Sequence, residues 1–381
     1  MSPTSTVVLI HCEGYDRDKV REAVTRGLGF LGGAGRFAGR GAKVLLKPNL
    51  LIGDPPEKCV TTHPAVFRAV AEAFIAVGAE VSYGDSPSFG GMSTAARRSG
   101  IAPIAAELGV VEADFHTPVD IFFEQGMQNR RFVIARAVKD ADVIVSIPKF
   151  KTHGFQKFTG CVKNQFGCVP GLRKGEYHVK LADANDFARM LIDLNRLVAP
   201  SLYVMDGICA MEGNGPRGGR PRPLNLLMFS TDPIACDATA CRIVGLDPLL
   251  VPTIRFGAIA GAGTYLESEI ELLGDDITCF IKEDFAADRR PIRPYRSRGL
   301  MRFVSNRLVP KPYLKGDMCV RCGKCVEMCP TFPKSIDWEN DDHTKPPTHR
   351  YRTCIRCYCC QEVCPESAIE LRYPILRKVF R

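Results

Sequence analysis

The sequence predicts an α/β domain, built on a largely parallel sheet with flanking helices, followed by a small α+β domain at the C-terminus. Two observations lead to this fold class. Apolar runs rich in β-branched residues alternate with amphipathic segments between residues 7 and 244, and cysteines in a dense pattern begin only at Cys319. Apolar runs without polar alternation are typical of strands buried on both faces, and their alternation with helices is typical of a parallel sheet.

Six strands and three crossover helices are expected in the first domain. The strands are predicted at Val7–His11, Lys43–Lys47, Glu80–Tyr83, Val143–Ile147, Leu202–Met205 and Leu224–Phe229. The helices are predicted at Pro64–Val77, Asp186–Leu197 and Pro233–Val244. Apolar side chains recur at helical spacing in the second of these helices, and Asp232 can cap the third.

Length and charge divide the chain into three parts. The 381 residues are enough for a large core and an additional module, and a composition of 45% hydrophobic and 24% charged residues is that of a globular protein. The net charge of +9 is concentrated in residues 289–315, which contain nine Lys and Arg and no acid. We interpret this Pro- and Arg-rich segment as a linker, not as a nucleic-acid-binding face. The predicted boundaries are therefore 1–288, 289–315 and 316–381.

The cysteine distribution predicts a cytoplasmic protein. The 17 cysteines are clustered, and the N-terminus lacks the basic and apolar pattern of a signal peptide, so we expect a reducing compartment. No apolar run approaches the roughly 20 residues that span a bilayer. Apolar and basic residues at 300–308 and 372–381 could touch a membrane surface, but we favour packing against the large domain.

Two cysteine motifs of identical spacing define the C-terminal domain. Both read C-x2-C-x2-C-x3-C-P, which is the pattern of bacterial two-cluster ferredoxins. In that pattern the fourth cysteine of each motif binds the other cluster. We therefore expect a ferredoxin-like domain with two [4Fe-4S] clusters. One cluster is assigned to Cys319, Cys322, Cys325 and Cys364, and the other to Cys354, Cys357, Cys360 and Cys329. A zinc site would not need the third thiol of each motif, and Cys359 is surplus.

Polar loops follow most of the predicted strands. In a parallel sheet these loops meet at the edge where ligands bind. Turns rich in Asp, Gly, Pro and Ser occur in any α/β protein, but lysines are not turn formers. The loops contain Lys47, Asn49, Asp85, Ser86, Lys149, Lys151, His153, Gly213 and the segment Ser230–Pro233, and Lys163 follows nearby. The four lysines predict a site for an anionic or carbonyl-bearing ligand.

The densest group of candidates lies in IPKFKTHGFQKFTGCVKNQFGCVPG, residues 147–171. Lys149, Lys151 and His153 alternate along the chain, so they are expected on one side, where they could supply protons. For His153 a role as an acid or a metal ligand competes equally with that of a loop hydrogen-bond donor. Gly160 and Gly167 are expected to permit a close approach of the backbone to a ligand.

These motifs resemble the family called domain of unknown function 362. The resemblance rests on KPNL at 47–50, TTHPAVFRAV at 61–70, YGDSPS at 83–88, the KxKTH and VKNxFG motifs within 149–167, and TDPIACDATACRIVGLDP at 231–248. It covers roughly residues 7–248. Fusion to a ferredoxin module is a usual arrangement in that family, so the resemblance implies an iron–sulfur context. It implies no established catalytic residue.

Two functions fit these observations. The leading hypothesis is an iron–sulfur oxidoreductase that exchanges electrons between the C-terminal domain and a substrate or cofactor at the strand ends, with a separate electron-donor or acceptor protein. The alternative is a non-enzymatic iron–sulfur carrier or assembly protein, for which a flat surface is expected instead of a cleft. The catalytic candidates are Lys149, Lys151, His153, Lys163, Asn164 and Asp85, and the cofactor-binding candidates are Lys47, Asn49, Ser86 and Gly213.

Short nucleotide-binding motifs are absent. No GxGxxG follows the first strand and no GxxxxGK[ST] occurs, so neither a nicotinamide nor an ATP site is expected. A flavin need not leave a short motif, so the sequence gives no indication for or against one.

Overall fold

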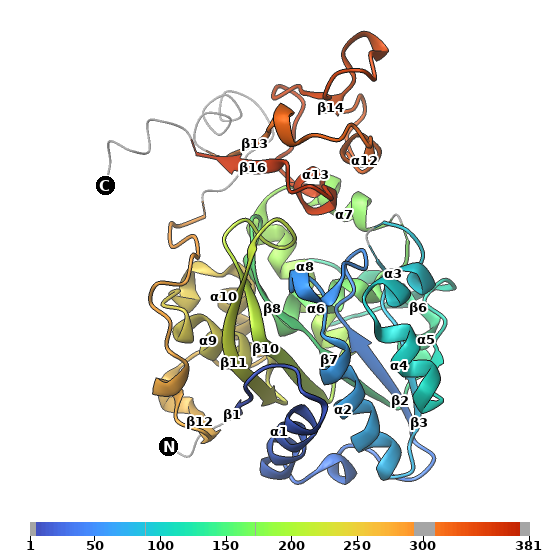
Figure 1. Cartoon of the computed structure of the whole chain (residues 1–381), viewed down its shortest axis with the longest axis vertical. Helices are drawn as coiled ribbons and strands as arrows, with labels where there is room; N and C mark the ends of the chain where they lie inside the picture. The colour runs from blue at the N-terminus through green and yellow to red at the C-terminus, as the bar shows by residue number, and fades with distance from the viewer. Residues whose placement is uncertain (1–4, 88, 172, 293–308, 374–381) are drawn as a thin grey trace.

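The computed structural model describes residues 5–87, 89–171, 173–292 and 309–373. The residues considered above for membrane contact, at 300–308 and 374–381, lie outside the described residues. Residues 5–292 form one module, here called the α/β module. Residues 309–373 form a second, here called the cysteine module, and it sits on one end of the first (Figure 1).

A ten-stranded sheet forms the centre of the α/β module, and the predicted fold class is confirmed. The strand order is β12-β1-β11-β10-β7-β2-β3-β4, with β8 paired to β10 and β9 paired to β8. The bounds are β1 Ser5–His11, β2 Lys43–Pro48, β3 Glu80–Tyr83, β4 Val111–Glu112, β7 Val143–Ile147, β8 Lys149–His153, β9 Lys157–Thr159, β10 Leu202–Glu212, β11 Arg220–Ser230 and β12 Ile270–Gly274. All six predicted strands are present. A separate hairpin joins β5 Pro118–Phe122 to β6 Arg131–Ala135.

Helices cover both faces of the sheet, which is why β7 is buried along its whole length. The longest are α1 Arg17–Phe30, α2 Pro64–Ala76, α8 Ala184–Val198 and α9 Pro233–Ile243, and the last three were predicted. The shorter helices are α3 Met92–Arg98, α4 Ile101–Leu108, α5 Arg136–Asp140, α6 Cys161–Asn164, α7 Arg173–Lys180 and α10 Pro252–Ile259. Helix α1 packs against α2, while α8, α9 and α10 pack together as another group (Figure 1).

Strand β11 corrects one part of the sequence prediction. Strands β10 and β11 are longer than predicted and form a hairpin, so β11 runs antiparallel to both of its neighbours. Its end, Ser230–Pro233, therefore lies at the opposite edge of the sheet from the other predicted loops. The expectation that this segment shares their edge is wrong, because the turn after β10 reverses the chain directly.

The cysteine module contains two small antiparallel sheets, two short α-helices and two single-turn 3-10 helices. One sheet pairs β13 Lys311–Leu314 with β16 Ile369–Arg372, and the other pairs β14 Ile336–Asp337 with β15 Thr348–His349. Helices α12 Lys324–Glu327 and α13 Cys359–Val363 carry part of the two cysteine motifs. Strand β13 lies before residue 316, so the end of the predicted linker pairs with the module.

The tip of the β10–β11 hairpin holds the cysteine module. The Arg217 guanidinium donates to both carboxylate oxygens of Asp54 at 2.8 Å and, across the interface, to the Val363 carbonyl at 2.7 Å. The Asn214 amide donates to the Ile369 carbonyl at 3.0 Å. Both modules therefore contribute to one buried interface at the end of the sheet where the predicted loops meet (Figure 1).

Candidate functional site

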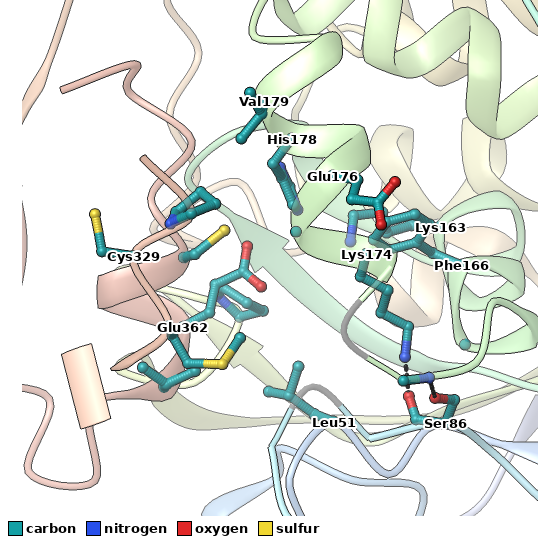
Figure 2. A pocket seen from close by; sticks show the side chains of 18 of the residues that line it. Leu51, Ser86, Lys163, Phe166, Lys174, Glu176, His178, Val179, Cys329 and Glu362 are labelled. Atoms are coloured by element: carbon teal, nitrogen blue, oxygen red, sulfur yellow. Dashed lines mark hydrogen bonds between the residues drawn. The ribbon is translucent and has the colours of Figure 1, made fainter. Parts of the chain in front are cut away.

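A cavity of about 600 Å³ lies between the two modules. Figure 2 shows Lys163 and Lys174 on one side of it and Cys329 and Glu362 on the other. Its lining includes Asn49, Asp85, Ser86, Lys151, His153, Lys163, Asn164 and Lys174 from the α/β module, and Cys329, Cys359, Glu362 and Val363 from the cysteine module. The volume is within the range of small-molecule pockets.

Lys151 reaches the cavity from the middle of β8. Its ammonium donates to Asn49 Oδ1 at 2.6 Å and to the Val60 carbonyl at 2.7 Å, and both acceptors are neutral. Burial, together with the nearby Lys163 and Lys149, lowers the pKa of Lys151 to about 7. Near neutral pH this lysine can therefore both hold and release a proton.

Lys163 and Lys174 also face the cavity. The Lys163 ammonium lies 5.2 Å from the centre of the Phe166 ring, and burial lowers its pKa. The Lys174 ammonium, which extends from α7, donates to the Ser86 carbonyl. Burial lowers the pKa of Lys174 to about 8, against the opposing effect of Asp85. The three lysines bring basic groups to one space, as the sequence predicted for Lys151 and Lys163 but not for Lys174.

His153 and Glu362 meet across the module interface. The His153 Nε2 atom lies 3.3 Å from Glu362 Oε1, although the two are not aligned as a hydrogen bond. The Phe155 amide donates to His153 Nδ1 at 3.0 Å, so the neutral ring carries its proton on Nε2, toward Glu362. Burial lowers the pKa of His153. Burial opposes ionisation of Glu362, but His153 and Lys163 hold its pKa at about 2.

Two further polar atoms of the cavity lining have no hydrogen-bond partner in the described part of the chain. They are His178 Nδ1, on α7, and Thr159 Oγ1, on β9. Both residues are buried. Since buried polar groups are normally paired, these two atoms mark positions where a ligand could bond.

Lys47 and Lys149 do not line the cavity. The Lys47 ammonium lies 2.9 Å from Asp85 Oδ1, and the Lys149 ammonium lies 2.8 Å from Asp206 Oδ2. Both pairs are fully buried, and Lys149 also contacts the Tyr15 hydroxyl at 2.8 Å. Each ammonium charge is compensated by a carboxylate from a neighbouring strand or loop. These lysines therefore stabilise the edge of the sheet and do not face a ligand.

The predicted glycines serve protein packing. A Cβ on Gly167 would overlap Asp85 Oδ1 and lie 2.7 Å from Lys47 Nζ, and a Cβ on Gly160 would overlap Asp237 Oδ1. The expected close approach to a ligand is therefore an approach to the protein's own carboxylates. Gly213 lies at the hairpin tip, where its carbonyl accepts from Thr152 Oγ1 at 3.1 Å, and it does not line the cavity.

The cysteines gather in two groups. Cys364 lines a small cavity with Cys319, Cys322 and Cys325. Burial, together with the nearby Cys364, Cys319 and Cys322, raises the pKa of Cys325 to about 12. Burial also raises the pKa of Cys360, as do Cys357, Cys354, Cys325 and Cys329. Both fourth cysteines thus lie with the opposite motif.

The surroundings of these thiols fit an iron–sulfur cluster. The Ser335 amide donates to Cys329 Sγ at 3.3 Å and the Ala368 amide donates to Cys364 Sγ at 3.2 Å. Amide donors of this kind stabilise the sulfur ligands of clusters. Among the described residues, no three or more His, Cys, Asp or Glu side chains are arranged so that they could hold a single metal ion. Four thiols around a cluster stand further apart, because iron and sulfide fill the space between them.

Comparison with known proteins agrees with this arrangement. The model of the family described as "Domain of unknown function (DUF362)" matches residues 44–242, and that of the 4Fe-4S dicluster domain matches residues 318–368. The chain belongs to the DUF362 family. The resemblance noted in its motifs is confirmed, and this DUF362 protein carries a 4Fe-4S ferredoxin-type domain with an electron-transfer role.

Proteins similar to this DUF362 protein are found among sequences and among solved structures. A thylakoid-associated protein of Synechocystis sp. (strain ATCC 27184 / PCC 6803 / Kazusa) is 37% identical over 250 residues, which are 65% of this chain and 77% of that protein. The lactate racemase apoprotein from Thermoanaerobacterium thermosaccharolyticum matches at a TM-score of 0.42 and 12% identity, over 62% of this chain and 56% of that one. A Thermotoga maritima protein matches at a TM-score of 0.34 and 12% identity, over 61% of this chain and 60% of that one. No helix among the described residues is long and apolar enough to cross a membrane.

Among the polar residues of the cavity, sequence reasoning missed Lys174 and His178 on α7 and Glu362 in the cysteine module. Lys174 and His178 belong to α7, which follows no strand directly and was not predicted. Glu362 lies inside the second cysteine motif, between Cys360 and Cys364, where its side chain drew no attention beside the thiols. Its position as a charged residue inside a motif of metal-binding cysteines was the one feature of the sequence that could have drawn attention to Glu362.

Proposed function

We propose that this DUF362 protein is an oxidoreductase in which two [4Fe-4S] clusters exchange electrons with a small molecule held in the cavity between the modules. One observation carries the proposal. Cys329, the assigned ligand of one cluster, lines the same cavity as Lys151, Lys163 and His153. A molecule in this cavity would touch both a cluster ligand and the proton-bearing side chains.

The protein residues would bind the molecule and move protons. When bound, the clusters supply single electrons. His153 would hold a proton at Nε2, where the Phe155 amide fixes the ring. Lys151 would hold or release a proton near neutral pH, in keeping with its pKa of about 7. The hydrogen bond from Arg217 to the Val363 carbonyl would hold the two walls of the cavity together.

The two assigned cluster sites differ in exposure. In the first motif Cys322 is exposed, and the neighbouring Val320 and Met318 are 57% and 40% exposed. In the second site Cys329, Cys357 and Cys360 are buried. We therefore assign the first site to exchange with a separate electron-donor or acceptor protein, and the second to exchange with the cavity. The proposed setting is the cytoplasm, and the proposed substrate is a small anionic or carbonyl-bearing compound.

The alternative of a non-enzymatic carrier or assembly protein predicted a flat surface at the strand ends. The concave, lysine-lined cavity favours the oxidoreductase.

Anaerobic purification tests the proposal. The protein should contain iron and sulfide for two clusters, and mass spectrometry of the released small molecules should find one compound that is retained by the wild type. Lys163→Ala should lose the compound while it keeps its iron. Zinc without sulfide, or a compound retained equally by Lys163→Ala, would contradict the proposal.

A further inference from the structure

We propose that the cavity ligand carries a dianionic group, either a phosphate monoester or a pair of carboxylates, which Lys151, Lys163 and Lys174 hold together. This inference rests on the proposed function and names the class of molecule that the cavity takes. A ligand that has a carbonyl group but no dianionic group would not fit this proposal.

The first observation is a contrast between paired and unpaired lysines. Lys47 and Lys149 each have a buried carboxylate, at 2.9 and 2.8 Å. In the described residues, by contrast, no carboxylate oxygen lies within the 4.0 Å of an ion pair from the ammonium groups of Lys151, Lys163 or Lys174. Glu362 attracts Lys151 and Lys163, and Asp85 attracts Lys163 and Lys174, but only from beyond that distance. An anion in direct contact with the three ammonium groups would therefore stabilise their charged forms.

The second observation is that Lys163, which lines the same cavity, acts on both of the other lysines. Lys163 lowers the pKa of both Lys151 and Lys174, so its ammonium is close enough to each for repulsion. Two ammonium groups about 4 Å apart repel by roughly 1 kcal/mol in water and by several times more when partly desolvated. An anion between them would replace this repulsion by attraction.

The third observation concerns neutral donors. The Thr159 hydroxyl and His178 Nδ1 are buried in the lining and have no partner among the described residues. A hydroxyl can donate to a phosphate or carboxylate oxygen, and a neutral imidazole can donate from either nitrogen. A dianionic group offers more acceptor atoms than three lysines use, so it can also satisfy these donors.

Apolar side chains indicate how the rest of the ligand lies. Phe166 and Leu51 line the cavity on the α/β side, and Met328 and Val363 line it on the cysteine side, next to Cys329. The body of the ligand would contact these side chains while its dianionic group contacts the lysines. Two sources share this chemistry: a phosphate-bearing redox cofactor, such as a flavin mononucleotide, and a dicarboxylate substrate.

Calorimetry on the desalted, anaerobically purified holoprotein tests the inference. Sulfate is the minimal dianionic probe and acetate the monoanionic one. Flavin mononucleotide against riboflavin tests the phosphate source, and succinate against butyrate tests the dicarboxylate source. We expect sulfate to bind at least about tenfold more tightly than acetate, and one of the two pairs to show the same preference for its dianionic member.

Variants locate the binding. Lys163→Ala should weaken sulfate binding by about tenfold or more, since a charge-assisted hydrogen bond is lost. Lys139→Ala is the matched control, because Lys139 is an exposed lysine of α5 outside the cavity, and it should leave the affinity within about twofold. Iron content and thermal unfolding of each variant check that the fold is intact. Lys151→Met gives a second variant should Lys163→Ala not fold.

The outcomes separate this inference from the proposed function. Equal affinity for sulfate and acetate, or sulfate binding unchanged in both lysine variants, overturns the dianion site whatever the redox results are. Dianions that bind through the lysines without any electron exchange with the clusters would leave the site standing and overturn the oxidoreductase.

Discussion

His153 Nε2 lies 3.3 Å from Glu362 Oε1, and these two residues belong to different modules. His153 ends strand β8 of the central sheet, whereas Glu362 is in the helix that carries Cys359 and Cys360. The chemistry of the cavity therefore depends on how firmly the cysteine module is docked. Arg217, which contacts Asp54 on one side and the Val363 carbonyl on the other, is the residue that tests this docking.

Arg217→Met should loosen the docked module. The substitution leaves Asp54 buried without its partner, so we expect a loss of about 3–5 kcal/mol in the free energy of unfolding. The measurement is denaturant unfolding followed by far-UV circular dichroism and by cluster absorbance. Arg220→Met is the matched control, since Arg220 lies in the same hairpin with its side chain 75% exposed and should cost less than about 1 kcal/mol. Equal losses of unfolding free energy in the two variants would contradict the role of Arg217 in docking the cysteine module.

Gly167→Ala should destabilise the sheet edge. Its new methyl group would displace Asp85 from Lys47, so we expect a loss of about 3 kcal/mol, within the range for overpacking and for disturbed buried pairs. Gly29→Ala is the control, because no atom lies within 4 Å of its Cβ position in helix α1 and alanine favours the helix. Urea unfolding of both variants measures the two changes in the free energy of unfolding. A Gly167→Ala protein as stable as the wild type would show that the pair has room to move.

The crossed arrangement of the cysteines predicts which cluster each substitution damages. Cys329→Ala should impair the cluster of Cys354, Cys357 and Cys360, and Cys364→Ala should impair the other. Cys359→Ala should keep the iron of both, because Cys360 and not Cys359 lies with the opposite motif. Iron analysis and electron paramagnetic resonance of the reduced proteins measure this. Loss confined to the first cluster in Cys329→Ala would rule out the crossing.

Binding of sulfate should weaken as the pH rises from 6 to 9. Sulfate stays a dianion over this range, whereas Lys151, with a pKa of about 7, and Lys174, with a pKa of about 8, lose their charges. The charged groups around Lys151 are Lys149, Lys163, Glu362 and Asp54. Lys151→Met should remove the part of the decline near pH 7. Calorimetric titration at each pH is the measurement, and an affinity that does not depend on pH would contradict a lysine-held anion.

The sequence alone was sufficient to predict those features of the protein that depend on the spacing of residues along the chain. The cysteine motifs are read along the chain, so their spacing alone assigns the two groups of thiols. The strands were also predictable, because burial on both faces leaves continuous apolar runs such as Val143–Ile147.

Pairing of charges across the fold was not predictable. Lys47, near the end of β2, and Lys151, in β8, lie toward the same end of the sheet. Lys47 is neutralised by Asp85, which is on another loop, whereas Lys151 donates to neutral acceptors. Nothing in the spacing distinguishes them. Lys174 reaches the cavity only because α7 folds back over it, and Glu362 only because the cysteine module docks there.

Reoxidation of the reduced clusters tests the central claim most directly. The protein is reduced with dithionite, freed of excess reductant and mixed in a stopped-flow instrument with the small molecule that purifies with it, while cluster absorbance is followed. We predict rapid reoxidation in the wild type and in Lys139→Ala, and a rate at least about tenfold lower in Lys163→Ala at unchanged iron content. Equal rates in all three proteins, or no reoxidation by any compound that binds the cavity, would contradict the account.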